Sequence, residues 1–229
     1  MKTAGIIGGL GPETTSKFYL ETVFSCFDKD KINRPPMLIW NVPLPYQIEE
    51  EFILKAIGEE NYKPFLVDAA QRLEKGGADF IVIPCNSVHV LIKEVRKSVH
   101  VPVLSIVEET VNYLTANKIP DVGLLATSVT IRQKLYEKTL RENGIQIHVP
   151  DDTDQEQMGT IINNLVHSRQ DAQDKEKLFA ITQKLTESGI TTILLACTDL
   201  QLISPVMEKA TIIDTMEILV QATVRELLK

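Results

Sequence analysis

The chain has 229 residues, of which 44% are hydrophobic and 24% are charged, and its formal net charge is -7. This length and apolar content can bury one large core or two small ones, and the spread negative charge without a Lys/Arg run argues against nucleic acid or anionic membranes as partners. Residues 1–3 lead into a predicted strand without a secretory signal, and no apolar run reaches the roughly 18 residues of a spanning helix, so we expect a cytoplasmic protein with a small-molecule partner.

Buried β-rich runs alternate with amphipathic helical patterns along the whole chain. Strands are expected at 4–7, 37–41, 80–84, 103–105, 122–125, 145–148, 193–195 and 211–213. Helices are expected at 13–26, 62–76, 88–98, 106–117, 131–143, 154–167, 171–188 and 215–228. Strands that alternate with helices of this length predict an α/β fold with parallel sheets.

The pattern is duplicated, because residues 4–15 and 122–130 both combine a short buried strand, small residues and the start of a helix. In each half a later β-rich run ends at a cysteine. We therefore expect two similar α/β lobes related by a pseudo-twofold axis, with the last helix packed on the first lobe. The expected lobes are residues 1–102 plus 213–229 and residues 103–212.

The two repeated cysteines are Cys85 and Cys197, and each is followed at once by small polar residues. This places both at the carboxyl edge of a parallel sheet, where open α/β folds hold their ligands. If the lobes face each other, the two thiols flank one cleft and suggest proton transfer on opposite faces of one small molecule. Cys26 lies in a helical pattern and is expected in the core, and an odd number of cysteines fits a reducing compartment.

Other chemistries are less well supported by the spacing. The glycines at 8, 9 and 11 resemble half of a dinucleotide fingerprint, but no acidic residue ends a second strand at the required distance, so no dinucleotide is expected. Cys85 and His89 would suit the nucleophile and base of a hydrolase, although His89 could equally be a solvent-capped helix residue. Zinc-ligand spacing is missing, so no metal is expected. Backbone N–H groups at several helix starts could hold a carboxylate.

Five motifs together resemble the aspartate/glutamate racemase family, whose members need no pyridoxal phosphate. They are GGLGP at 8–12, PCNSVH at 84–89, IVEET at 106–110, LLATSVT at 124–130 and ACTD at 196–199. They occur in family-like order from residue 3 to the C-terminus, and the opening resembles the aspartate racemase branch. The resemblance implies two α/β lobes with the active site in the cleft between them, no cofactor, and a homodimer.

The resemblance also implies roles for individual residues. Cys85 and Cys197 carry over as the two acid/base residues, Leu10 as a cleft-lining residue, and five polar residues as substrate-holding positions: Asn86, Ser87, Thr127, Thr130 and Thr198. By spacing, Gln47 replaces a family Arg, Val166 falls near a family Lys, and Asp199 stands where the branch favours Glu. An amide binds a carboxylate less strongly than a cation does, so we expect weak activity on aspartate or a broadened substrate range.

The sequence thus predicts an amino-acid racemase or epimerase with two-base proton transfer at Cα. A thiol pKa of about 8.5 makes both protonation states reachable, and we expect helix N-termini behind the cysteines to lower it. Two alternatives remain. One is a related superfamily enzyme, such as a maleate isomerase, an arylmalonate-type decarboxylase or a hydantoin racemase. The other is a non-catalytic amino-acid-binding protein.

Overall fold

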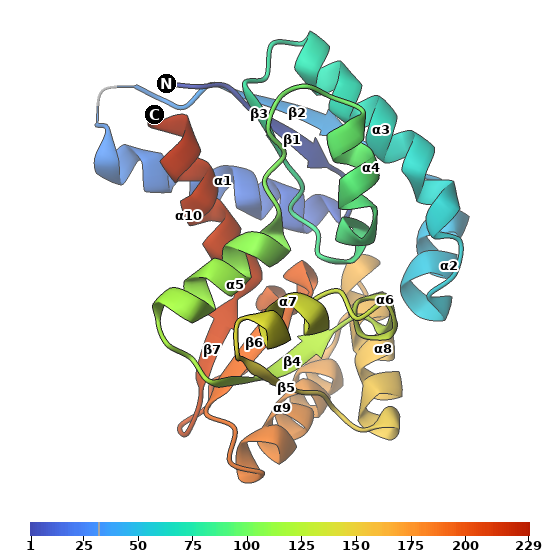
Figure 1. Ribbon diagram of the computed structural model, residues 1–229. Helices are drawn as coiled ribbons and strands as arrows, with labels where there is room; N and C mark the ends of the chain where they lie inside the picture. Colours follow the sequence, from blue (N-terminus) through green and yellow to red (C-terminus); the bar gives the residue numbers. More distant parts are fainter. Residues whose placement is uncertain (32) are drawn as a thin grey trace.

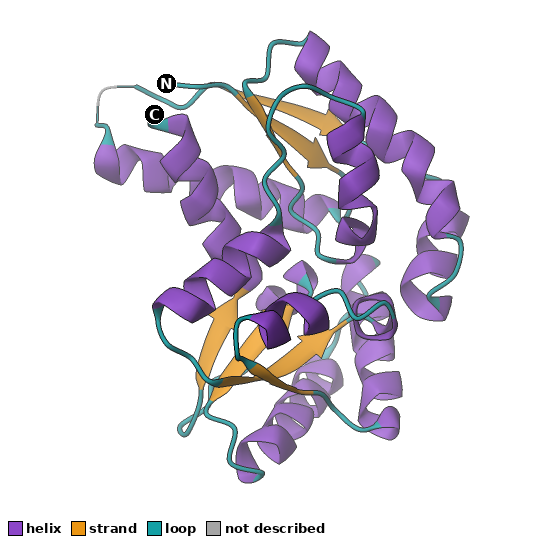
Figure 2. Ribbon diagram, in the orientation of Figure 1, coloured by secondary structure: helices purple, strands orange, loops and turns teal. Residues whose placement is uncertain are grey.

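The computed structural model describes residues 1–31 and 33–229 and contains two parallel sheets, one in each half of the chain (Figures 1 and 2). The first has the order β2-β1-β3 and the second the order β5-β4-β6-β7. Their strands are β1 (Ala4–Gly8), β2 (Met37–Asn41), β3 (Phe80–Val82), β4 (Asp121–Ala126), β5 (Gln146–His148), β6 (Thr192–Ala196) and β7 (Thr211–Asp214). The predicted α/β class with two parallel-sheet lobes is confirmed.

Helices connect these strands and cover the sheets. Those before β4 are α1 (Pro12–Lys29), α2 (Tyr46–Lys55), α3 (Glu59–Lys75), the 3-10 helix η1 (Ser87–Leu91), α4 (Ile92–Lys97) and α5 (Ile106–Ala116). Those after β4 are α6 (Ser128–Arg132), α7 (Glu137–Glu142), α8 (Asp152–Val166), α9 (Ala172–Glu187), the 3-10 helix η2 (Thr198–Ile203) and α10 (Thr215–Leu227). Five of them begin at a residue whose side chain accepts a backbone N–H bond, which satisfies a donor that the first helical turn leaves free. These residues are Ser105, Thr127, Asp151, Asp171 and Asp214.

The two halves repeat one strand order. Val103 forms an isolated parallel bridge with Ile81 of β3. The segment at Val103 therefore lies beside β3 in the same way as β7 lies beside β6. Helix α5 follows the first of these positions and α10 follows the second. The two helices pack against each other, and α10 also packs against α1 near the two chain ends (Figure 1). The division into residues 1–102 plus 213–229 and residues 103–212 stays a prediction.

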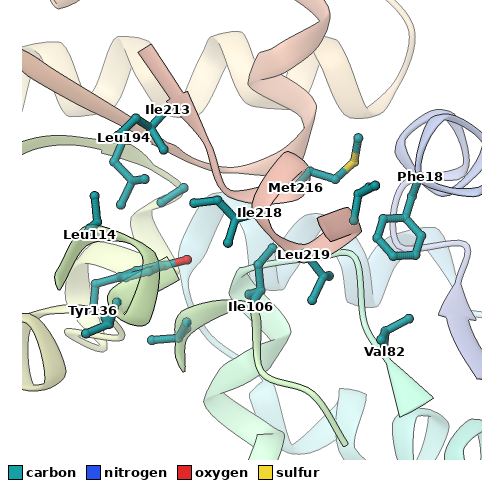
Figure 3. Close-up of a cluster of buried hydrophobic side chains, with 14 of the residues drawn as sticks. Phe18, Val82, Ile106, Leu114, Tyr136, Leu194, Ile213, Met216, Ile218 and Leu219 are labelled. Atoms are coloured by element: carbon teal, nitrogen blue, oxygen red, sulfur yellow. The ribbon is translucent and has the colours of Figure 1, made fainter. Parts of the chain in front are cut away.

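The largest hydrophobic core lies around α10 and joins the two halves (Figure 3). Met216 and Leu219 of α10 share this core with Phe18 of α1, Ile106 of α5 and Leu194 of β6. Each of these five side chains is fully buried, and burying such side chains stabilises a fold by about 1.5–3 kcal/mol each. Cys26 is fully buried in the same core, which confirms the packing role predicted for it. The first and last helices therefore both belong to the core that joins the two halves.

The prediction of one helix at 131–143 is wrong, because this segment contains the end of α6 and the separate helix α7. Lys134 has a φ of 52°, and the N–H groups of Lys134 and Leu135 bond back to Ile131 and Thr130, which ends α6. The break allows Tyr136 to enter the core, where it is fully buried. The strand expected at 103–105 is reduced to the single bridge of Val103, and the helix expected at 88–98 begins as η1. Helix α2 was not predicted.

None of the helices in the described part of the chain is long and apolar enough to cross a membrane. The cytoplasmic location and the homodimer stay predictions.

Candidate active site

A small cavity lies where the carboxyl ends of the strands from both sheets meet. The centre of a water-sized sphere can occupy about 20 Å³ of it, which is roughly the room that one water needs. It is lined after the strand ends by Leu10, Gly11, Cys85, Asn86, Ser87, Val88, Thr127, Cys197, Thr198 and Asp199, and on helices by Glu49, Phe52, Tyr62, Ile162 and Val166. Helix α2 closes it by packing across the halves against α6 and α8.

The two cysteines that the sequence singled out line this same cavity. Cys85 follows β3, and Cys197 comes directly after β6. The two thiols interact, because the negative charge of a Cys85 thiolate raises the pKa of Cys197. Each sulfur faces the backbone N–H groups two and three residues further on, at Ser87 and Val88 in one case and at Asp199 and Leu200 in the other. The duplicated sequence pattern therefore corresponds to a duplicated local geometry.

Burial keeps both thiols protonated in this closed cavity. Loss of hydration raises the pKa of Cys85 to about 12 and raises the pKa of Cys197 well above its ordinary value. The charge of Asp199 raises both pKa values further, whereas the backbone N–H groups lower them. The backbone N–H groups at the helix starts thus lower the thiol pKa as expected, but the net shift of each pKa is upward because desolvation outweighs the amides.

Asp199 is the polar group beside Cys197. The Cys197 Sγ donates to Asp199 Oδ2 at 3.8 Å, and burial raises the pKa of the carboxyl to about 7. The carboxylate also lies against Gly11, because a Cβ placed on this glycine would be 3.0 Å from Asp199 Oδ1. Gly11 has a φ of 34°, which side chains rarely allow. The glycine-rich turn therefore makes room for a carboxyl group rather than for a dinucleotide.

Three hydroxyl groups link the two halves at the cavity wall. Ser87 Oγ and Thr127 Oγ1 lie 2.8 Å apart, although they come from different sheets. Thr127 Oγ1 also accepts the N–H of Thr130 at 3.2 Å and donates to its hydroxyl at 3.1 Å. Thr198 Oγ1 donates to the carbonyl of Pro84 at 3.4 Å.

Asn86 is held at both ends of its amide. Its Nδ2 donates to Thr215 Oγ1 at 3.0 Å, and its Oδ1 accepts the hydroxyl of Tyr136. The Thr215 hydroxyl in turn donates a hydrogen bond to the Leu195 carbonyl at 2.9 Å. Every member of this chain is buried, so the side chain next to Cys85 has one fixed orientation.

His89 does not form a dyad with the Cys85 thiol. Its Nε2 accepts the N–H of Ile106 at 3.1 Å, so its Nδ1 carries the hydrogen and donates to the Cys85 carbonyl at 2.7 Å. Burial lowers the pKa of His89 to about 4, which keeps the ring neutral. Both ring nitrogens thus have backbone partners, and the hydrolase interpretation loses its base.

Seven of the nine site residues predicted from the sequence line the cavity: Leu10, Cys85, Asn86, Ser87, Thr127, Cys197 and Thr198. Thr130 is buried behind Thr127 and contacts it. Gln47 is exposed on α2, where it donates to Glu51 at 3.4 Å, and it lies outside the cavity lining. Glu49, two residues on, lines the cavity instead and was missed. The spacing of four between Ile48 and Phe52, with Glu49 three residues before Phe52, was the available signal for a helix face.

Among the residues that the structure describes, no cluster of three or more His, Cys, Asp or Glu side chains is arranged to hold an ion.

Two repeated α/β halves with a cavity between their strand ends define the racemase-type fold. The chain belongs to the Asp/Glu/hydantoin racemase family, whose model matches residues 7–223. It is 30% identical over 228 residues to the broad specificity amino-acid racemase RacX of Bacillus subtilis strain 168, covering 96% of both chains. Racemases are isomerases, so the predicted enzyme class is confirmed.

Solved structures agree with this assignment. An aspartate racemase homologue from Pyrococcus horikoshii OT3 is 28% identical with a TM-score of 0.78, and the match covers 100% of both chains. The aspartate racemase of Picrophilus torridus has a TM-score of 0.82 at 23% identity, covering 100% of this chain and 95% of that chain, which supports the fold.

Proposed function

We propose that this protein racemises free amino acids without a cofactor, by proton transfer at Cα between Cys85 and Cys197. The observation that carries the proposal is the placement of one thiol from each repeated half on the same cavity. The two thiols are close enough for the charge of one to alter the pKa of the other. The name of the Bacillus subtilis relative, a broad specificity amino-acid racemase, supports the reaction type.

The reaction needs one cysteine as a thiolate and the other as a thiol. The thiolate removes the α-proton, so a C–H bond breaks, an S–H bond forms, and the electron pair stays on the substrate as a carbanion. The opposite thiol then gives its proton to the other face of Cα and becomes the thiolate. The two cysteines have exchanged protonation states, and the enzyme is ready for the reverse direction.

Asp199 is suited to generate the thiolate of Cys197. It already accepts the thiol hydrogen, and a pKa of about 7 lets it take up a proton near neutral pH. The ammonium group of a bound amino acid places a positive charge in the same cavity, which lowers the pKa of both thiols. The backbone N–H groups that face each sulfur stabilise the thiolate in the same way.

The polar wall is suited to the substrate carboxylate, where negative charge grows as the α-proton leaves. Asn86, Ser87, Thr127 and Thr198 present amide and hydroxyl donors to the cavity, and Leu10 is apolar. Preorganised donors in a site without water are usually the largest catalytic contribution. Thr130 supports Thr127 rather than the substrate.

Entry of an amino acid requires an opening movement, because the cavity now has room for about one water. Glu49 and Val166 line both the cavity and an adjoining hollow of about 750 Å³, which is bounded by the turn from β1 into α1, the connection from β2 into α2, and the end of α8. We place the entrance there. Closure over the substrate would exclude water and set the distances from each sulfur to Cα.

Single substitutions of the two cysteines test the proposal. Cys85→Ala and Cys197→Ala should each lower the rate of racemisation by at least about 10²–10⁴, the usual contribution of one acid/base group. Cys26→Ala is the matched control, since Cys26 is buried in the core away from the cavity. Chiral chromatography of a panel of amino acids gives the rates. Racemisation at the wild-type rate after removal of either cavity cysteine would contradict the two-thiol mechanism.

A further inference from the structure

The turn after each cavity cysteine is repeated beyond the cavity lining itself. Cys85 is followed by η1 and Cys197 by η2, and a polar side chain comes four residues after each cysteine. These side chains are His89 in the first half and Gln201 in the second, and neither lines the cavity. Their equivalent positions raise the question of whether they have the same role for the two thiols.

His89 joins the Cys85 turn to the start of α5. Its Nδ1 donates to the Cys85 carbonyl at 2.7 Å, and its Nε2 accepts the N–H of Ile106, the first residue of α5, at 3.1 Å. The side chain is buried, so neither bond competes with bulk water. The ring therefore fixes the distance between the cysteine backbone and the first turn of the helix.

Gln201 joins the Cys197 turn to the start of α10. Its Nε2 donates to the Thr198 carbonyl at 2.7 Å and to the Sδ of Met216, the second residue of α10, at 3.0 Å. The orientation of the amide follows, because an oxygen in the place of Nε2 would face the Thr198 carbonyl oxygen. The Oε1 is buried and accepts no hydrogen bond from the residues that the structure describes. Gln201 thus makes its bridge through the two hydrogens of Nε2.

Helices α5 and α10 relate these two bridges to each other. The two helices hold equivalent places in the two halves, and they pack against each other. Ile106 and Met216 are both fully buried in the core that joins the halves (Figure 3). Each cysteine turn is therefore attached, through one polar side chain, to the packing between the two halves as well as to its own sheet.

The backbone of each turn shows why its orientation matters. N–H groups in each turn face the sulfur of its cysteine and lower the pKa of that thiol. They stabilise a thiolate only while they point at the sulfur, because hydrogen bonds weaken steeply as their angle closes. A turn that rotates would lose this stabilisation and would also move the sulfur away from its position beside Cα.

We propose that His89 and Gln201 are equivalent positioning residues, which hold the turns of Cys85 and Cys197, respectively, in the orientation that each thiol needs for proton transfer. This inference rests on the proposed racemase function and deepens it. Each residue serves one thiol, and therefore one face of Cα.

Hydrogen exchange in single-cysteine backgrounds tests the assignment of one residue to one thiol. In Cys197→Ala only Cys85 exchanges the α-hydrogen, so adding His89→Leu should slow exchange in D2O at least about tenfold, and adding Gln201→Met should change it less than about twofold. In Cys85→Ala the two effects should be reversed. His89→Gln should restore most of the exchange, because an amide also presents one donor and one acceptor side by side. Circular dichroism checks that each variant is folded at the assay temperature.

Alkylation of the thiols gives a second measurement that needs no turnover. With iodoacetamide at about pH 8 and peptide mass spectrometry, His89→Leu should slow modification of Cys85 relative to Cys197, and Gln201→Met should do the reverse, because the thiolate is the reacting form. Gln173→Met, at an exposed position on α9, is the control and should change neither rate.

The two measurements separate this inference from the proposed function. If either variant slows exchange and alkylation at both thiols alike, or at neither thiol, the inference is overturned while the racemase proposal stands. If the alkylation pattern holds but neither single-cysteine variant exchanges an α-hydrogen, the two-thiol mechanism fails and the positioning roles remain.

Discussion

Replacing Tyr136 by Phe tests whether the amide beside Cys85 is held in place from the second half of the chain. The substitution removes one hydroxyl group with little change in volume, and it leaves Asn86 Oδ1 buried without a donor. An unsatisfied buried polar atom costs about 1–3 kcal/mol. In a protein of this size, each kcal/mol lowers the melting temperature by about 2–4 °C, so the expected fall is about 2–12 °C.

The same variant should lose activity, because Asn86 is free to turn its amide away from the cavity. Differential scanning calorimetry and the racemisation rate are the two measurements, and Tyr113→Phe is the control, since Tyr113 is an exposed tyrosine on α5. A double-mutant cycle between Tyr136→Phe and Asn86→Ala should give a coupling free energy of about 1 kcal/mol or more in stability. A melting temperature and coupling energy unchanged within error would refute the role of this network.

Three further substitutions probe the rest of the site. Asp199→Asn removes an acid whose pKa is raised by burial from 3.8 to about 7, so the wild type loses stability as the pH rises through this range while the variant does not. Denaturant unfolding between about pH 4 and pH 8 should show the variant gaining up to about 4 kcal/mol relative to wild type, at 1.36 kcal/mol per pKa unit, and parallel pH curves would contradict the assignment. His89→Leu leaves the N–H of Ile106 and the carbonyl of Cys85 unpaired, so unfolding should become easier by about 2–5 kcal/mol; an inactive variant with unchanged stability would show that His89 is a base after all. Gly11→Ala and Gly77→Ala each place a side chain on a residue with a positive φ, so each should lower the free energy of unfolding by about 1–3 kcal/mol, measured by thermal unfolding. Only Gly11→Ala also crowds Asp199, so only this variant should slow racemisation. Equal rates for the two glycine variants would show that Gly11 has no role beyond its backbone.

The residues that the sequence predicted best are those set by local patterns. Cys85 and Cys197 each follow a β-rich run, and the duplication of this pattern was enough to predict that both line one cavity. The glycine turn at Gly11 was also visible, although its purpose depends on Asp199, which lies far away in the sequence. Local hydrophobic periodicity and turn residues carry this information because they act over a few positions.

The features that the sequence did not predict depend on contacts between the halves. Helix α2 is short and follows Pro43 and Pro45, and it packs against α6 and α8 of the second half. Glu49 was missed with it. The break before α7 likewise follows from the burial of Tyr136, which tertiary packing decides. The raised thiol pKa values have the same origin, because desolvation depends on what the folded chain places around each sulfur.

Hydrogen exchange at Cα, measured by proton NMR in D2O with each pure enantiomer, tests the two-thiol account most directly. A single surviving thiol can still remove and return a proton on its own face. Cys85→Ala and Cys197→Ala should therefore each wash deuterium into one enantiomer only, the two variants should select opposite enantiomers, and neither should racemise. Exchange of the same enantiomer by both variants, or racemisation by either at the wild-type rate, would contradict the assignment of one thiol to each face.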